Sequence, residues 1–231
     1  MIRFRNFVLF LLFALSANIY AKEGGIQLER TRLLIENGKT SVSMAVKNHY
    51  DRPVLASAFV SNFDGTPSEA FAVTPSIFQI RADSAVKTQV VLLKKLPEDR
   101  ESVFWMNVRT VLSENSNSDI NVSKSSSLEL AIGQRIKLFY RPITITEKCE
   151  DAAKTIIFHT KGKELIAKNS SGVSLSILEI ETDGDVQKIA DTVMPKSTSK
   201  WELKIPVKSS SLFTYIDENG NLVKHLINIT K

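Results

Sequence analysis

The feature that most constrains the fold of this chain is a succession of short segments, rich in Val, Ile, Leu, Phe and Thr, separated by turn residues. Such side chains favour β-strands, whereas Gly, Asn, Asp and Pro between them favour turns or cannot donate to a ladder. The first series covers residues 25–35, 40–48, 54–63, 71–80, 88–93, 103–111 and 128–140. Short strands at this spacing predict an immunoglobulin-like β-sandwich.

A second series of strand-like segments follows Pro142 and adds too many strands for one sandwich. It covers residues 154–159, 164–169, 173–182, 200–205, 212–216 and 222–229. Helical periodicity is nearly absent after the N-terminal apolar run. The sequence therefore predicts an all-β chain of two domains, residues 22–144 and 145–231, with the boundary near residues 141–146.

The N-terminus has the pattern of a secretory signal peptide. Two arginines precede an apolar run over residues 7–15, and the small residue Ala21 precedes a charge. Ile19 is a departure, because a small residue is usual at its position. We expect residues 1–21 to be a cleaved signal. A retained anchor is less favoured because the apolar run falls short of the ~20 residues of a spanning helix, and no later segment reaches that length.

The charge of the chain argues against a nucleic-acid partner. The formal net charge is +5, and removal of the signal with its two arginines leaves +3. The remaining cations are scattered among acids, whereas nucleic-acid binding calls for a concentrated basic face.

No pattern of an enzyme or of a cofactor site is present. The histidines, His49, His159 and His225, lack metal-ligand spacing, and the single cysteine, Cys149, can form neither an internal disulfide nor a zinc site. Neither a G-x-S-x-G motif nor a glycine-rich phosphate loop occurs. We therefore expect a protein that is not an enzyme and that binds no cofactor or metal.

Two basic stretches share one unusual form. Arg30-Thr31-Arg32 and Arg135-Ile136-Lys137 each place two cations just before an apolar run that belongs in a core. Burying a lone cation costs several kcal/mol after relaxation, so a carboxylate must accompany it. The residues alone leave two sources open: an internal acid, or the carboxylate of a ligand that Arg32 and Lys137 would bind.

An apolar ladder precedes the second basic stretch. Leu128, Leu130 and Ile132 alternate with polar or small residues, and by periodicity alone this face would pack into the core. The ladder also follows a long Ser/Asn-rich segment, residues 113–127, as an edge strand free to pair with a partner would. The first interpretation is favoured by pattern and the second by context.

The chain resembles the PapD-like periplasmic pilus chaperones of the chaperone–usher pathway. The resemblance covers the first domain almost entirely and the second more weakly. It rests on Leu28-Glu29-Arg30-Thr31-Arg32, Ala72-Val73-Thr74-Pro75-Ser76, Leu96-Pro97-Glu98-Asp99-Arg100-Glu101-Ser102, Ile136-Lys137-Leu138-Phe139-Tyr140-Arg141-Pro142 and Tyr215-Ile216-Asp217-Glu218-Asn219-Gly220.

The resemblance implies two immunoglobulin-like β-sandwich domains with a cleft between them. In that cleft Arg32 and Lys137 would anchor the C-terminal carboxylate of a pilus subunit. Leu128, Leu130 and Ile132 would be the ladder of a strand donated to the incomplete subunit, so the family overturns the core-packing interpretation for them.

Further residues are implied at the domain junction. Glu101 and Arg141 would form an ion pair there with an acid of the second domain, either Asp217 or Glu218. The long loop lacks the prolines and the flanking cysteine pair that separate the subclasses of the family, so the subclass stays open.

The resemblance also implies partners and a location. We expect a periplasmic, non-enzymatic chaperone that binds pilus subunits and delivers them to an outer-membrane usher. When no subunit is bound, we expect the chaperone to associate with a second copy of itself. The alternative is a structural or adhesive surface protein of two immunoglobulin-like domains, with an internal ladder and internally paired cations.

Overall fold

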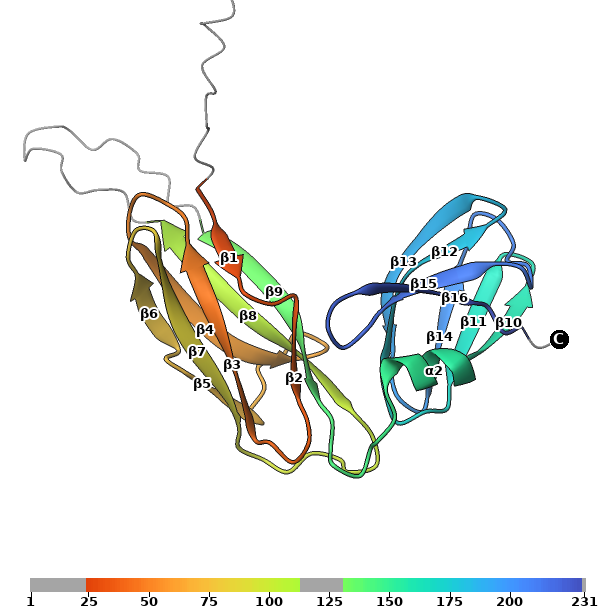
Figure 1. Ribbon diagram of the computed structural model, residues 1–231, viewed down its shortest axis with the longest axis horizontal. Helices are drawn as coiled ribbons and strands as arrows, with labels where there is room; N and C mark the ends of the chain where they lie inside the picture. Colours follow the sequence, from red (N-terminus) through yellow and green to blue (C-terminus); the bar gives the residue numbers. More distant parts are fainter. Residues whose placement is uncertain (1–23, 113–130, 230–231) are drawn as a thin grey trace, which may run out of the picture.

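The structure, a computed structural model, describes residues 24–112 and 131–229 and contains two β-sandwiches joined by a short connection (Figure 1). The all-β prediction is confirmed. The first domain pairs one sheet of β1 (Ile26–Leu28), β3 (Ser41–Asn48), β7 (Ser84–Leu92) and β5 (Phe71–Thr74) with a second of β2 (Arg32–Ile35), β9 (Ala131–Tyr140), β8 (Ser102–Leu112), β4 (Val54–Asn62) and β6 (Ile77–Ile80).

The second domain has the same two-layer form. One sheet consists of β10 (Ile157–Lys161), β11 (Glu164–Asn169) and β14 (Ser197–Glu202). The other consists of β13 (Asp185–Val193), β12 (Leu175–Thr182), β15 (Leu212–Ile216) and β16 (Leu222–Leu226). A short helix, α2 (Cys149–Thr155), packs where the chain enters this domain.

Each sandwich encloses its own apolar core. Leu33, Met44 and Met106 are fully buried in the first, while Phe158 and Phe213 are fully buried in the second. Alternate side chains of facing sheets fill these interiors, as the period of two in a strand requires. Two separate cores explain why the chain has too many strands for one sandwich.

The predicted strand over residues 25–35 is wrong as a single element. β1 pairs antiparallel with β3, whereas β2 pairs parallel with β9 in the opposite sheet. The chain therefore changes sheets between Leu28 and Arg32. Burial does not alternate across this change, because residues 29–31 are all exposed and Arg32 and Leu33 are both buried, but no Gly, Pro, Asn or Asp marks it in the sequence.

Two more first-domain segments differ from the sequence prediction. The strand predicted over residues 71–80 is divided into β5 and β6, which belong to different sheets, with Pro75 between them. Proline has no N–H to donate, so a ladder is easily interrupted there. The strand predicted over residues 88–93 begins earlier, because β7 pairs with β3 from Ser84 onwards.

The second domain contains a helix where a strand was expected to begin. Residues up to Thr155 belong to α2, and the strand β10 starts at Ile157. Cys149, Ala152 and Ala153 are buried at helical spacing. Seven residues offer barely two turns, so the sequence shows too little periodicity to signal a helix.

The sequence prediction missed β13 altogether and placed β14 a few residues late, over residues 200–205. β12 and β13 form a hairpin around Asp183 and Gly184, both with positive φ, 54° and 88°. Asp-Gly is a strong hairpin signal because it suits turns with positive φ at both central positions. The polar composition of β13 concealed it.

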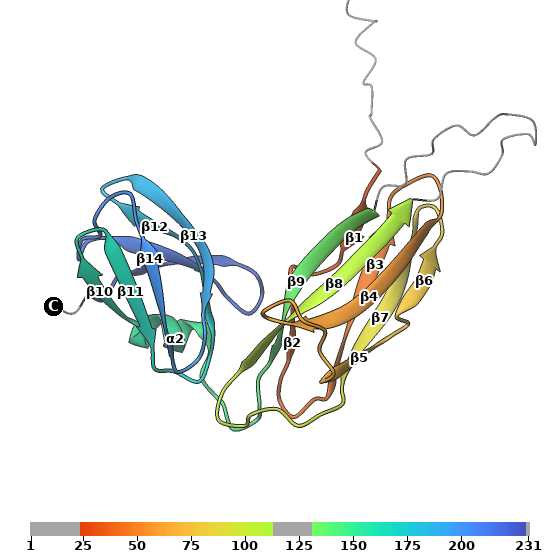
Figure 2. The same ribbon diagram turned by 180° about the vertical axis from the view of Figure 1, so that it is seen from behind.

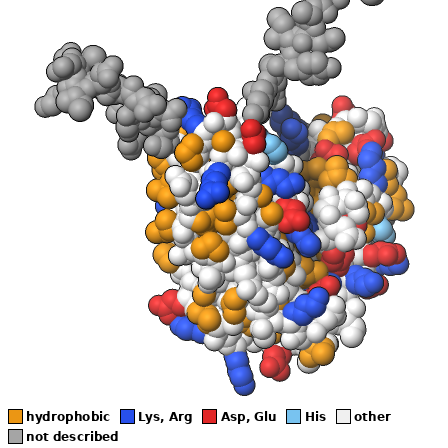
Figure 3. All heavy atoms as spheres, turned by 60° about the vertical axis from the view of Figure 1, so that its left-hand side comes forward, with side chains coloured by type: hydrophobic (Ala, Val, Ile, Leu, Met, Phe, Trp, Pro, Cys, Tyr) orange, Lys and Arg blue, Asp and Glu red, His pale blue; other side chains and the backbone are white. Residues whose placement is uncertain are grey.

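The two domains diverge from their connection, and the β15–β16 hairpin reaches back toward the first domain (Figures 1 and 2). Contact there is close, because a Cβ added to Gly220 in the hairpin turn would lie 2.7 Å from Thr31 Oγ1. On the face of the first domain shown in Figure 3, Lys and Arg side chains are interspersed with acidic and uncharged residues.

Candidate binding site between the domains

One half of β9 has an unpaired edge among the described residues. β8 pairs with β9 along its whole length, from Ala131 to Tyr140. On its other side, β2 pairs only with the stretch from Lys137 to Tyr140. Backbone N–H and C=O groups of residues 131–136 on that side are therefore open to another strand.

A groove runs along this open edge. It is lined by Ile26 and Leu28 of β1 and by Gln134 and Ile136 of β9. The Gln134 side chain donates to the Ile26 carbonyl at 3.0 Å, which links the two strands without a ladder. The groove combines apolar and polar contacts, because its other lining residues are polar or charged: Gln27, Arg30, Thr31 and Arg135.

The two faces of β9 have different surroundings. Ile136 and Leu138 pack into the first core, but Ile132 is half-buried and belongs to neither core. On the opposite face Arg135 lies 4.5 Å from the ring centroid of Trp105. The core-packing interpretation therefore holds for the C-terminal half of the strand and not for Ile132. Leu128 and Leu130, like the loop 113–127, lie outside the described residues.

Lys137 projects from β9 toward the second domain. Its ammonium donates to the hydroxyl of Ser176 at 2.9 Å and to that of Thr192. Burial, and secondly the positive charge of Arg32, lower the pKa of Lys137 to about 8, while Asp191 acts in the opposite direction. The lysine is thus poorly compensated in the unliganded protein.

Arg32 lies beside the same cleft, is only 9% exposed and packs over the Phe139 ring at 5.4 Å. Its Nη1 donates to the carbonyl of Ile216 at 3.1 Å, and its buried Nε has no hydrogen-bond partner in the described part of the chain. Burial lowers the pKa of Arg32. The guanidinium therefore retains donors for an anion.

Neither cation has an internal carboxylate partner within 4.0 Å among the described residues. Of the two sources that the sequence left open, the internal acid is not observed there. Lys137 and Arg32 are instead held by neutral oxygens of the second domain.

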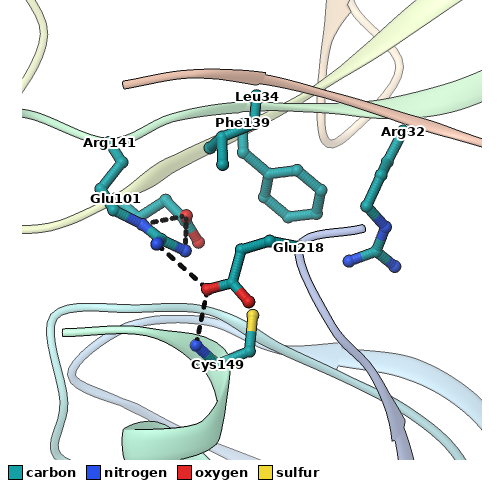
Figure 4. A pocket seen from close by; sticks show the side chains of 7 residues that line it. All are labelled: Arg32, Leu34, Glu101, Phe139, Arg141, Cys149 and Glu218. Atoms are coloured by element: carbon teal, nitrogen blue, oxygen red, sulfur yellow. Dashed lines mark hydrogen bonds and ion pairs between the residues drawn. The ribbon is translucent and has the colours of Figure 1, made fainter. Parts of the chain in front are cut away.

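A buried ion-pair network lies next to this pair (Figure 4). Arg141 Nη2 contacts Glu101 Oε1 at 3.0 Å, and Arg141 Nη1 contacts Glu218 Oε1 at 3.1 Å. Figure 4 shows the Phe139 ring between Arg141 and Arg32. The structure therefore places Glu218, and not Asp217, at the position of the second-domain acid. Asp217 instead accepts hydrogen bonds from Asn219 and Asn221 within its own turn.

Glu101 is 3% exposed and also joins the domains through Ser174. Its Oε2 accepts from the Ser174 backbone N–H at 2.9 Å and from the Ser174 hydroxyl. Burial raises the pKa of Glu101, and Arg141 and Ser174 oppose that rise. Breaking such a pair would leave a buried charge without compensation.

Cys149 completes the second-domain side of this network. Its backbone N–H donates to Glu218 Oε1 at 2.8 Å. The thiol is free and buried, and burial raises its pKa, so it is not a thiolate at neutral pH. Cys149 is therefore a packing residue at the N-terminus of α2.

Sequence reasoning missed the residues that complete this site. Ser176 and Thr192 are short polar residues within strands, Ser174 directly precedes β12, and nothing in their spacing marks them. Only the docking of the second domain brings them to Glu101 and Lys137. An indirect signal existed, because buried cations without nearby acids need other acceptors.

Other kinds of site are not supported by the described ranges. They contain no group of three or more His, Cys, Asp or Glu side chains that could hold a metal ion. None of their helices has the length and apolar character that a membrane span requires.

The fold and the site define a two-domain β-sandwich protein with an open strand edge beside two partly satisfied cations. Family models agree with this class. The model described as "Pili and flagellar-assembly chaperone, PapD N-terminal domain" matches residues 25–146, and "Pili assembly chaperone PapD, C-terminal domain" matches residues 151–226. The chain belongs to the PapD family of pilus-assembly chaperones.

Individual relatives cover nearly the whole chain. The chaperone protein FimC of Escherichia coli K12 is 27% identical over 212 residues, which cover 90% of this chain and 85% of FimC. The chaperone protein PmfD of Proteus mirabilis is 29% identical over 213 residues, which cover 86% of this chain and 81% of PmfD.

Solved structures share the fold. The Salmonella enterica SafB chaperone in complex with the SafA pilin aligns with a TM-score of 0.77 at 22% identity, covering 89% of this chain and 98% of the matched chain. The Escherichia coli chaperone DraB aligns with a TM-score of 0.74 at 21% identity, covering 90% of this chain and 97% of DraB.

Proposed function

We propose that this protein is a periplasmic chaperone that caps pilus subunits by lending them an edge strand and delivers them to an outer-membrane usher. The observation that carries the proposal is the open edge of β9 over residues 131–136, which ends at Lys137. A subunit that lacks one strand exposes an apolar slot and unpaired backbone groups, and such edges aggregate. Adding a strand satisfies both.

The donated ladder consists of Leu128, Leu130 and Ile132. The family resemblance supports the first two, and the position of Ile132 outside both cores supports the third. Each buried Leu or Ile contributes about 1.5–3 kcal/mol of transfer free energy before ordering costs. A few such residues, with the backbone ladder, suffice to hold a subunit.

Arg32 and Lys137 anchor the terminal carboxylate of the subunit. Both cations are partly buried and both retain donors, which a carboxylate would accept. An anchor at one end of the strand also sets its register, because a slip of one residue turns every side chain to the wrong face. No covalent chemistry is needed, so we propose that the protein is not an enzyme.

The network of Glu101, Arg141 and Glu218 supports the cleft by fixing the orientation of one domain relative to the other. Asp217 has a local role in the turn that presents Glu218. The proposed chain organisation is a signal over residues 1–21, which lie outside the described residues, followed by domains over residues 22–144 and 145–231.

Periplasmic co-expression with a pilin encoded beside this gene tests the function. The wild type should hold the pilin soluble in a one-to-one complex. Arg32→Ala, Lys137→Ala and Leu130→Glu should each lose the complex and remain folded, as measured by affinity capture and circular dichroism. Arg109→Ala is a matched control, since Arg109 is an exposed cation of the same sheet stacked 4.8 Å from Phe59.

Full capture of the pilin by both cation variants would refute the carboxylate anchor. Unfolding of the Leu130→Glu variant would instead assign the ladder to the core, as in the alternative of a structural or adhesive surface protein. Equal loss in Arg109→Ala would show that the effect is one of net charge.

A further inference from the structure

Lys137 is held by two hydroxyls that come from the other domain. Ser176 lies on β12 and Thr192 on β13, and the two are cross-strand partners in the second-domain sheet. Both are buried, at 3% and 4% exposure, and their oxygens are 3.4 Å apart. They form a fixed pair of acceptors facing the tip of Lys137.

The two hydroxyls do not occupy all the N–H donors of the Lys137 ammonium. A lysine ammonium has three N–H donors, and the two hydroxyls accept from two of them. One donor remains for an anion entering the cleft. The two hydroxyls are also hydrogen-bonded to each other at 3.4 Å, so one O–H donates within the pair.

The neutrality of these acceptors matters as much as their position. A carboxylate holding Lys137 would neutralise it and would compete with an incoming anion. The neighbouring acid, Asp191, is engaged elsewhere, because its oxygens accept from Trp201 Nε1 at 2.9 Å and from the Thr192 backbone N–H at 2.7 Å. Hydroxyls hold the ammonium and preserve its charge.

We propose that Ser176 and Thr192 are positioning residues that hold the Lys137 ammonium ready for the terminal carboxylate of the subunit. The inference rests on the proposed function and deepens it, because it makes the second domain part of chain-end recognition. A free lysine side chain loses much rotamer freedom on binding. Fixing it beforehand removes that loss from the binding step.

The test uses two synthetic peptides with the last residues of the neighbouring pilin, one with a free C-terminal carboxylate and one amidated. Titration of the mature full-length chain with each gives an acid-to-amide affinity ratio. The wild type should prefer the acid. In Ser176→Ala/Thr192→Val the acid should bind at least about tenfold more weakly, as expected for the loss of a hydrogen bond to a charged group, and the amide should bind as it does to the wild type.

A double-mutant cycle separates positioning from general damage. In a Lys137→Met background the two hydroxyl substitutions should have no further effect on either peptide. The conservative variant Ser176→Thr keeps a hydroxyl at this position and should therefore show the same preference for the acid as the wild type. A matched control is Thr182→Val/Ser211→Ala, which removes another buried hydroxyl pair of this domain, 2.6 Å apart, without touching Lys137.

The outcomes distinguish the two proposals. If the wild type shows no preference for the acid, the carboxylate anchor itself fails. If Lys137→Met abolishes the preference but the hydroxyl variant retains it, only the positioning role is refuted. Tighter acid binding by the hydroxyl variant would also refute it, since the hydroxyls would then compete with the carboxylate.

Discussion

The surroundings of Lys137 compensate its positive charge only in part. The side chain is partly buried, it lies near another cation, and its acceptors are neutral hydroxyls. Burial and the neighbouring cation disfavour the charged form of Lys137, whereas the two hydroxyls favour it through hydrogen bonds but bring no compensating charge. A bound carboxylate would reverse that balance, so binding and proton uptake at this residue are coupled.

This coupling predicts the pH dependence of subunit binding. The free protein loses the Lys137 proton near pH 8, whereas the carboxylate complex keeps it to higher pH. Affinity should be constant below about pH 8 and should then fall by about tenfold per pH unit. Isothermal titration with the free-acid pilin peptide described above, between pH 6.5 and 9.5, measures this.

Lys137→Arg is the appropriate control, because a guanidinium stays charged throughout that range. Its affinity should be flat between pH 7 and 9.5 even if its absolute value is lower. The same decline in both proteins would assign the pH dependence to another group.

Sequence reasoning at this scale identified the cations and not their acceptors. Arg32 and Lys137 stand out because two cations precede an apolar run in each stretch. Ser176 and Thr192 are ordinary strand residues whose role depends on a domain that folds separately. Which of Asp217 and Glu218 pairs with Arg141 likewise depends on the tertiary structure, since the side chains of adjacent residues point in different directions.

At the scale of elements, period-two alternation predicted most strands but not their partners. The prediction joins β1 to β2 and β5 to β6, because strand-forming residues lie on both sides of each change of sheet and do not specify the partner strand. The hairpin of β12 and β13 was missed although Asp183-Gly184 signals it. In that case local turn chemistry was the better indicator than hydrophobic pattern.

The role of this turn can be measured. Gly184 has φ of 88°, a conformation that L side chains rarely adopt, and an added Cβ would meet nothing within 4 Å. Gly184→Ala should therefore lower the free energy of unfolding by about 1–2 kcal/mol through backbone strain alone. Urea denaturation followed by circular dichroism gives this value.

Gly133→Ala in β9 is the matched substitution, because its added Cβ also meets nothing within 4 Å and its φ is not positive. It should be neutral or slightly stabilising. Comparable destabilisation by both substitutions would contradict the assignment of strain to the turn.

For the whole molecule, the relation between the domains is set by a few buried polar contacts. Glu101 and Arg141 of the first domain meet Ser174 and Glu218 of the second. The β15–β16 turn adds a steric contact through Gly220. The cleft is therefore a product of docking and belongs to neither domain alone.

Gly220→Ala should change this docking. Its added Cβ would lie 2.7 Å from Thr31 Oγ1 of the other domain, and its φ is 89°. We expect a measurable change in the radius of gyration by small-angle X-ray scattering and weaker pilin binding. Gly184→Ala, with nearly the same φ and no neighbour, should lower stability and leave the interdomain arrangement unchanged. Identical scattering from the two variants would refute the steric role.

The sequence by itself determined that the chain is all-β, that it forms two domains and that two basic stretches adjoin apolar runs, and its motifs indicated the family. These are consequences of local patterning, which acts within one strand and its turns. The tertiary structure decided where the chain changes sheets, which acid pairs with Arg141, that the edge of β9 is open and that hydroxyls of the second domain hold Lys137. Those features depend on contacts between residues far apart in the chain, and no local pattern encodes them.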